Sequence, residues 1–187
     1  MFKSVTSGNT KLGLARAAML SVAAVAAMGA AQAQAATDTT TFKVKLTVTE
    51  SCLIGATLPT DVSFANQART AAALTLDAAG QLNVNCTVGT AYNIGLNGGL
   101  NATIPAGTAA PVAGNRRMRL GATTNYVPYE LYSNAARTTF WGNTIGTSTL
   151  TGTGTGASVA VPVYGRVTSA NVPAGAYEDT VTATVTY

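Results

Sequence analysis

The chain has 187 residues, with 11 Lys and Arg, seven Asp and Glu, and no histidine. Without histidine the commonest general acid-base residue is missing, and two cysteines fall short of the four ligands of a structural zinc site. The acids show no recognisable catalytic spacing; they are Asp38, Glu50, Asp61, Asp77, Glu130, Glu178 and Asp179. We therefore predict a protein that is not an enzyme and that binds no cofactor or metal.

Residues 1–35 have the features of a secretory signal peptide. Lys3, Lys11 and Arg16 form a basic start, residues 17–36 carry no charge, and small residues near the end of this run suit signal peptidase. An uncleaved membrane anchor is the alternative, although an alanine-dominated run is weakly apolar for a bilayer span. Removing the leader leaves about 152 residues, enough for one domain. Three of the 11 basic residues go with it, so eight remain against seven acids, and the net charge of +1 gives no sign of nucleic-acid binding.

Residues 36–50 contain a stretch with one apolar and one polar face. Phe42, Val44, Leu46 and Val48 alternate with threonines and lysines, which is the period-two pattern of a β-strand. No partner strand is adjacent in the sequence, because a cysteine rather than a hairpin turn follows. We therefore expect this strand to complete a neighbouring molecule instead of its own domain.

Cys52 and Cys86 both remain in the mature chain. Export to an oxidising compartment makes a disulfide between them the expected state. Closing a loop of this size would stabilise the fold by about 4 kcal/mol. A free-thiol nucleophile is the alternative, but the chain has no histidine to activate it.

The mature chain has the composition of an all-β protein, since threonine is frequent and Gly, Asn and Pro interrupt short apolar runs. Strands are expected at residues 52–59, 62–67, 80–88, 91–97, 116–122, 126–133, 158–167 and 176–187. Residues 70–80 suit either a helical turn or a loop. A long exposed connection is expected at residues 98–115, and a flexible Thr/Gly loop at residues 147–158.

Alternation assigns several side chains to a face. Cys86 should point inward, on the same face as Val84. Arg117 and Arg119, in the basic run RRMR, should form a solvated strand face, with contact to phosphate or an anionic polysaccharide as the alternative. Pro128 lacks an amide donor, which predicts an edge position or a bulge.

The last residues repeat the pattern of the first strand, with Val181, Ala183, Val185 and Tyr187 on one face. An immunoglobulin-like sandwich is usually closed by one further strand after such a run. We therefore expect these residues to form one edge of a groove. The unpaired strand edge there could pair with a strand of another chain. A spare strand at one end and a vacancy at the other are what donor-strand complementation requires. Pairing of the two terminal strands within one molecule is the alternative.

Two other kinds of protein fit the same pattern. A secreted binding module would stack aromatic side chains on sugars, unless those side chains belong to the core or the groove rim. The aromatic candidates are Tyr126, Tyr129, Tyr132, Phe140 and Trp141. A coat or matrix protein would assemble through side-chain surfaces, and removal of the N-terminal strand would then leave its assembly intact.

Four blocks of the sequence together resemble a known family. They are FKVKLTVTESC near the start, YELYSNAARTTFW at residues 129–141, VAVPVYGRV at residues 159–167 and PAGAYEDTVTATVTY from Pro173 to the end. The Leu-Tyr-x-x-Ala-Ala-Arg-Thr core and the terminal Gly-x-Tyr-x-Asp-Thr run are the most specific parts. In these blocks the chain is similar to the spore coat protein U domain family, which includes subunits of archaic chaperone-usher pili.

The resemblance implies that residues 51–187 form an incomplete immunoglobulin-like β-sandwich, completed by a donor strand from another subunit. Cys52 and Cys86 match the family's disulfide pair, which ties the first core strand to a later one. The positions that match the family's donor strand are Phe42, Val44, Leu46 and Val48.

The resemblance also implies partners and a location. A periplasmic chaperone would lend the missing strand, an outer-membrane usher would receive the subunit, and identical or homologous subunits would then exchange strands without nucleotide. The protein would be exported through the periplasm to extracellular pili of a Gram-negative cell and would support adhesion and biofilm formation. One domain with a donor strand suits a pilus shaft subunit better than a tip adhesin.

Overall fold

The computed structural model describes residues 35–55, 58–68, 74–104 and 112–187. The chain divides into two compact units, residues 1–45 and residues 46–187. The predicted signal peptide lies outside the described residues except for Ala35. The described ranges contain no helix with the length and apolarity of a bilayer span.

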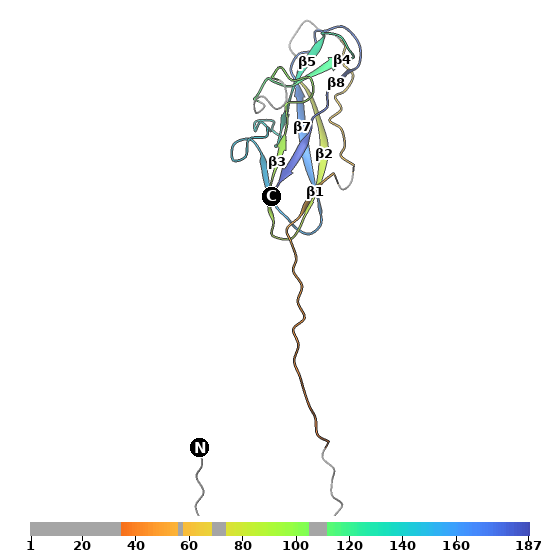
Figure 1. The fold of residues 1–187 in the computed structure, drawn as a ribbon. Helices are drawn as coiled ribbons and strands as arrows, with labels where there is room; N and C mark the ends of the chain where they lie inside the picture. The colour runs from red at the N-terminus through yellow and green to blue at the C-terminus, as the bar shows by residue number, and fades with distance from the viewer. Residues whose placement is uncertain (1–34, 56–57, 69–73, 105–111) are drawn as a thin grey trace, which may run out of the picture. The chain divides into compact units, whose positions relative to one another are not determined.

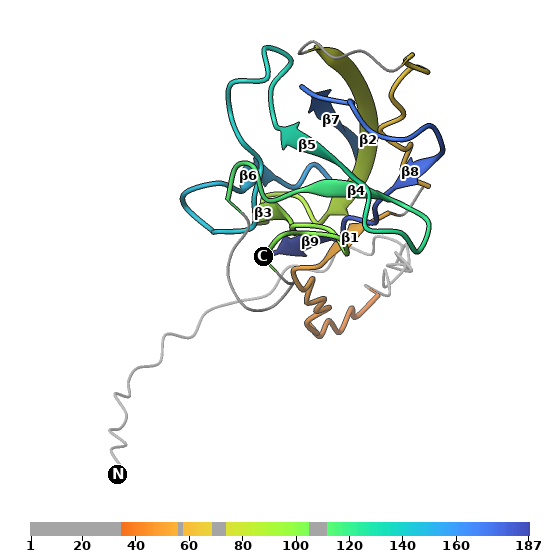
Figure 2. The same cartoon turned by 90° about the horizontal axis from the view of Figure 1, so that it is seen from above.

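The described residues of the second unit form nine β-strands (Figure 1). They are β1 (Cys52–Ile54), β2 (Leu76–Cys86), β3 (Ala91–Leu96), β4 (Arg117–Leu120), β5 (Tyr126–Tyr132), β6 (Leu150–Thr153), β7 (Ser158–Val167), β8 (Tyr177–Glu178) and β9 (Ala183–Thr186). Antiparallel pairing joins them into a six-stranded sheet, β1-β2-β7-β5-β4-β8, and a three-stranded sheet, β6-β3-β9. Apolar side chains of both sheets form one core, and Figure 2 shows β7 of the first sheet and β9 of the second well apart in this view. The all-β prediction is confirmed.

The strand order is that of an immunoglobulin-like sandwich without its last strand. Such folds place strands A, B, E and D in one sheet and C, F and G in the other. Here β1, β2, β7 and β5 follow one another in the first sheet, and β3 pairs with β9 in the second. Among the described residues, the second edge of β9 has no partner strand. No described strand therefore occupies the position of strand G.

The longest ladder joins β2 and β7, which pair from Leu76 with Val167 to Asn85 with Ser158. Cys86 is buried on the inner face, as predicted. The prediction of a helical turn or loop for residues 70–80 is wrong over residues 76–80, which belong to β2, while residues 70–73 lie outside the described ones. These residues form a strand because β7 pairs with them, and such a tertiary contact cannot be predicted from local propensity.

Two further loop predictions are wrong in part. Residues 150–153 of the Thr/Gly stretch form β6, because β3 provides a ladder for them. The connection after β3 is buried at both ends, at Gly98, Gly99 and Asn115, whereas residues 105–111 lie outside the described ones. Gly99 has a φ of +85° and lies against the Asp179 carboxylate, so a Cβ there would collide with it.

Pro128 lies on β5, an interior strand between β7 and β4, so the predicted edge position is wrong for the strand and holds only locally, at this residue. It pairs with Arg117 of β4, but the ladder between β5 and β7 begins only at Tyr129. Tyr129 N points toward the β4 side of β5, where it donates to Arg116 O at 3.1 Å. The nitrogen of the preceding residue, Pro128, therefore points to the other side of β5, at a position beyond the end of the β7 ladder. The missing amide donor therefore removes no ladder hydrogen bond.

The basic run RRMR forms a face that is only partly solvated. Arg116 is fully buried, and its guanidinium donates to Leu96 O at 3.1 Å, Asn97 O at 2.8 Å and Trp141 O at 2.7 Å. It also pairs with Glu130 at 2.9 Å. Burial lowers the pKa of Arg116, and the Glu130 charge opposes that shift. Arg117 and Arg119 are half-buried, so the face predicted from them is only partly solvated, and Arg117 Nε donates to Asn101 O at 2.6 Å.

Candidate functional site

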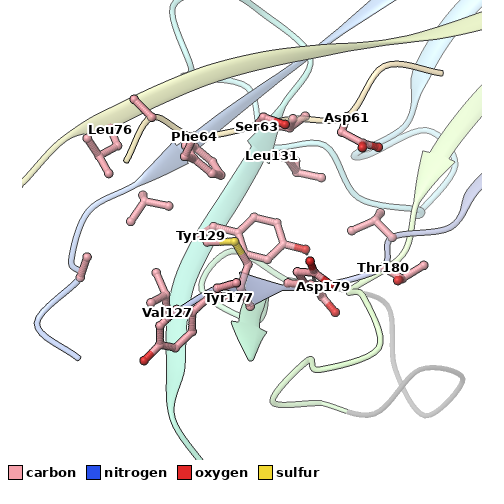
Figure 3. A pocket seen from close by; sticks show the side chains of 18 of the residues that line it. Asp61, Ser63, Phe64, Leu76, Val127, Tyr129, Leu131, Tyr177, Asp179 and Thr180 are labelled. Carbon is pink, nitrogen blue, oxygen red and sulfur yellow. Dashed lines mark hydrogen bonds between the residues drawn. The ribbon is translucent and has the colours of Figure 1, made fainter. Parts of the chain in front are cut away.

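A groove opens between two segments that flank the position of strand G. One rim is formed by residues 59–67 and the other by residues 170–183, and the volume between them is about 880 Å³. Figure 3 shows Ser63 and Phe64 on one side, Tyr177 and Thr180 on the other, and Tyr129 between them.

Apolar side chains from both sheets line this groove. Its floor includes Leu82, Leu96, Val127, Leu131, Val163 and Val167, and its rims add Val62, Phe64, Val172, Tyr177, Val181 and Ala183. The floor residues Leu96 and Val167 are only 2% exposed, so they belong to the core as well as to the groove. The groove, of about 880 Å³, is open to solvent, so its apolar lining is hydrated unless another chain covers it. The groove is therefore filled by water or by another chain segment.

The main chain of both rims has unpaired groups. Thr60 and Gln81 form two backbone hydrogen bonds, at 2.9 and 3.1 Å. Within the described part of the chain, residues 61–67 form no further backbone–backbone hydrogen bond. On the second rim, Thr180 O accepts from Leu100 N at 3.1 Å, and Thr182 O from Asn97 N at 3.0 Å. These bonds use only one side of the second rim. Unpaired backbone beside an apolar groove is a template for an added strand.

Glycines let the first rim lie close to the sheet. A Cβ at Gly80 would collide with Thr60 O, and a Cβ at Gly165 would collide with Val62 and lie 2.9 Å from the Phe64 ring. Both positions lie on the paired strands β2 and β7. Larger residues at either position would displace this rim.

Tyr129 and Asp179 link the floor to the second rim. The Tyr129 hydroxyl donates to Asp179 at 2.7 Å, and Asp179 also accepts from Asn101 N at 3.0 Å. Burial, and then the hydrogen bond to Asp179, raises the pKa of Tyr129. These bonds hold the chain where it passes from β8 in one sheet to β9 in the other. Sequence reasoning missed this role, although Asp179 lies in the terminal Gly-x-Tyr-x-Asp-Thr run.

Arg137, from the Leu-Tyr-x-x-Ala-Ala-Arg-Thr motif, links the paired strands β2 and β7. It has a φ of +56°, donates to Gly165 O at 3.0 Å and Ala78 O at 3.1 Å, and pairs with Asp77 at 3.3 Å. Arg166 holds the same carboxylate at 2.7 and 2.9 Å. The hydrogen bond from Arg166 is the main cause that lowers the pKa of Asp77.

The predicted donor-strand residues lie outside the core. Residues 35–51 belong to no described strand, and Phe42, Val44, Leu46 and Val48 are 84, 86, 87 and 72% exposed. Thr87 binds the end of this segment, because Thr87 N donates to Ser51 O at 2.9 Å and Ser51 N donates to Thr87 Oγ1 at 3.2 Å. The donor role of these residues stays a prediction.

The predicted groove edge divides into two parts. Val181 and Ala183 line the groove, Val185 packs against the core without lining it, and Tyr187 is 58% exposed. Sequence reasoning did not identify residues 59–67 as the opposite rim. The inward alternation of Val62 and Phe64 is the signal that points to it.

Cys52 and Cys86 form the expected disulfide. They face each other in the ladder between β1 and β2, with their Cα atoms 4.1 Å apart. The described residues contain no free cysteine and no cluster of three or more metal-ligating side chains. The free-thiol alternative is therefore wrong.

The aromatic side chains form no open stacking platform. Trp141 is fully buried and its Nε1 donates to Ile94 O at 2.8 Å. Tyr129 is buried, and the Arg117 guanidinium lies 3.8 Å from the centre of the Tyr126 ring. Phe140 lies beneath Arg116 at 5.3 Å. Most of the candidate sugar-binding aromatics are thus part of the core or covered by arginines.

Comparison with known proteins gives three results. The model of the Spore Coat Protein U domain matches residues 38–184. Protein U of Myxococcus xanthus is 37% identical over 179 residues, which cover 92% of this chain and 98% of that protein. A crystal structure of the CsuC–CsuE chaperone–tip adhesion subunit pre-assembly complex, from archaic chaperone-usher Csu pili of Acinetobacter baumannii, aligns with a TM-score of 0.49 and 25% identity.

The extent of these matches differs. The alignment with the Csu complex covers 75% of this chain but only 40% of the solved chain, so the present protein spans about two fifths of that chain's length. The family match, by contrast, includes the donor-like segment, both rims of the groove and the disulfide. The chain therefore belongs to the Spore Coat Protein U domain family.

Proposed function

We propose that this chain is a structural, non-enzymatic subunit of a chaperone-usher pilus and that it polymerises by donor-strand exchange. Residues 36–50 of one subunit enter the groove of the next, after a periplasmic chaperone has occupied the groove and an outer-membrane usher has received the subunit. The filament then supports adhesion and biofilm formation at the cell surface. The proposal rests on one observation: a single chain carries both an open apolar groove and an exposed, unpaired apolar segment.

Simple energetics support this proposal. Burial of an apolar side chain contributes about 1.5 to 3 kcal/mol, so four donor side chains would contribute about 6 to 12 kcal/mol. The unpaired backbone of the two rims adds ladder hydrogen bonds at about 1 kcal/mol each. A joint of that strength is long-lived and needs no nucleotide to form.

A coat subunit is the second candidate, because the description of the matching family names a spore coat protein. Such a subunit would assemble through its side-chain surfaces and would leave the groove to water. The two candidates differ in one requirement, since only strand exchange needs residues 37–49.

Three forms of the mature protein, expressed in the periplasm, test this requirement. The first is intact, the second lacks residues 37–49, and the third carries those residues behind Tyr187 on a short flexible linker. We call the third form the rearranged form. Folded yield, oligomeric state and denaturant midpoint are measured for each, and the mass of the disulfide-bonded chain is checked.

We expect the deleted form to fold poorly and the rearranged form to be a stable monomer, because the rearranged form fills its own groove. A deleted form that folds and assembles as well as the intact one would overturn strand exchange and favour the coat subunit. A deleted form that folds well but stays monomeric, with saturable glycan binding, would favour a secreted binding module.

A further inference from the structure

The charged residues that line the groove all have the same sign. They are Asp61 on the first rim and Glu178 and Asp179 on the second, and the lining includes no described lysine or arginine. Asp179 is already bound by Tyr129 and Asn101. Asp61 and Glu178 are exposed, and the described residues form no ion pair with either of them. Within the described residues the groove thus presents two carboxylates that form no ion pair.

Arg119 of β4 lies directly opposite Glu178 of β8 in the antiparallel ladder between these strands. The Nε of Arg119 donates to Thr123 O at 2.7 Å, and the Nε of Arg117 donates to Asn101 O at 2.6 Å. Among the described residues neither guanidinium forms an ion pair with Glu178, although the charge of Arg119 stays on this side of the second rim.

The complementary charge lies in the exposed tail. Lys43 and Lys45 are the only lysines that follow the predicted signal peptide, and they alternate with Phe42, Val44 and Leu46. When those apolar side chains point into a groove, both lysines must point to the opposite face, about 7 Å apart.

Alternation along each rim turns its carboxylate toward that same outer face. Val62 and Phe64 on the first rim, and Tyr177 and Val181 on the second, are half-buried, whereas Asp61 next to Val62 and Glu178 next to Tyr177 are exposed at the mouth of the groove. Adjacent strands are about 4.8 Å apart, so a lysine on an inserted strand reaches a carboxylate on either rim.

We infer that the groove selects the tail of a second copy of this chain by charge, with Lys43 and Lys45 over Asp61 and Glu178. This inference rests on the proposed strand exchange and adds the identity of the donor. Apolar alternation alone would accept the tail of any similar subunit, whereas paired charges reject a tail with the wrong sign. Because exposed ion pairs contribute little affinity, the charges act mainly on the rate of encounter and on partner choice.

Charge reversal on each side tests the inference in the full mature chain. The donor variant carries Lys43→Glu and Lys45→Glu, the acceptor variant carries Asp61→Lys and Glu178→Lys, and a fourfold variant carries all four changes. The control variant carries Thr151→Lys and Ala160→Lys, two exposed positions outside the groove lining. Assembly after dilution from denaturant is followed by light scattering at about 0.01 M and about 1 M salt, where the Debye lengths are about 30 and 3 Å.

We expect each reversed pair to slow assembly about tenfold at low salt and only slightly at high salt. The fourfold variant should recover most of the parent rate, and the control should match the parent. Equal rates for the parent and the donor variant at both salt concentrations would overturn the charge inference, as would a fourfold variant as slow as either reversed pair.

Failure of the proposed function has a different signature. In that case the form lacking residues 37–49 assembles normally, whatever the charges of the groove. The rearranged form adds an independent readout, because its rate of refolding at low salt should fall in the donor variant and recover in the fourfold variant. A rearranged form that is stable but refolds at a rate insensitive to all four charges would sink the charge inference alone.

Discussion

The β2–β7 ladder and the groove are made from the same kind of alternating apolar sequence, yet one is closed and the other is open. Every residue from Leu76 to Asn85 has a partner in β7. Residues 61–67 have no backbone pairing among the described residues, although Val62 and Phe64 pack against the core. The difference is the presence or absence of one neighbouring strand. It separates a region that stabilises the domain from a region that is free to recognise another chain.

The largest effect expected in the closed region comes from Glu130→Ala. The change leaves the fully buried Arg116 without its acidic partner at 2.9 Å, and breaking a buried pair in this way destabilises by about 3 to 5 kcal/mol. Urea unfolding of the mature protein measures the loss. The double variant Arg116→Met with Glu130→Met is the matched control, and it should lose less, since no charge is left buried. An unchanged urea midpoint for Glu130→Ala would show that the pair does not hold the closed region together.

The disulfide offers a second and smaller test of the closed region. It spans a sequence separation of 34, for which the chain-entropy relation gives a stabilisation of up to about 4 kcal/mol. We expect Cys52→Ser with Cys86→Ser to lower the free energy of unfolding by about 2 to 4 kcal/mol while the rearranged form still fills its groove as a monomer. A rearranged form that loses its monomeric state without the disulfide would mean that the closed and open regions are not separable.

The smallest expected effect concerns pH. Arg166 and Arg137 lower the pKa of Asp77 on the outer face of the ladder. A carboxyl whose folded pKa lies below its unfolded value of about 3.9 adds stability above that value, and this contribution is lost as pH falls through the folded pKa. The difference in unfolding free energy between the parent and Asp77→Asn should therefore be present at neutral pH and should shrink below about pH 4. A difference that stays constant across this range would assign the effect of the substitution to packing instead of charge.

Much of the fold could be predicted from alternation, because a period of two assigns side chains to faces whatever the partner strand is. The inward position of Cys86, its pairing with Cys52 and the local edge at Pro128 follow from residue type and spacing. The candidate donor segment was also visible in this way, since Phe42, Val44, Leu46 and Val48 need only their own sequence to form one apolar face. The same holds for Lys43 and Lys45, which the pattern places on the opposite face.

Other features depend on residues that meet only in the folded chain. Residues 150–153 and 76–80 form strands because β3 and β7 lie beside them. Arg116 is buried because carbonyls from residues 96, 97 and 141 and the Glu130 carboxylate surround it.

The position of the groove was likewise decided by tertiary structure. Residues 59–67 and 170–183 lie far apart in the sequence, and only the folded sheets make them its two rims. The sequence by itself therefore determined which segments have an apolar face, because side-chain direction is local. Tertiary structure decided which of those faces are covered and which edge stays open, because a strand's partners come from distant parts of the chain.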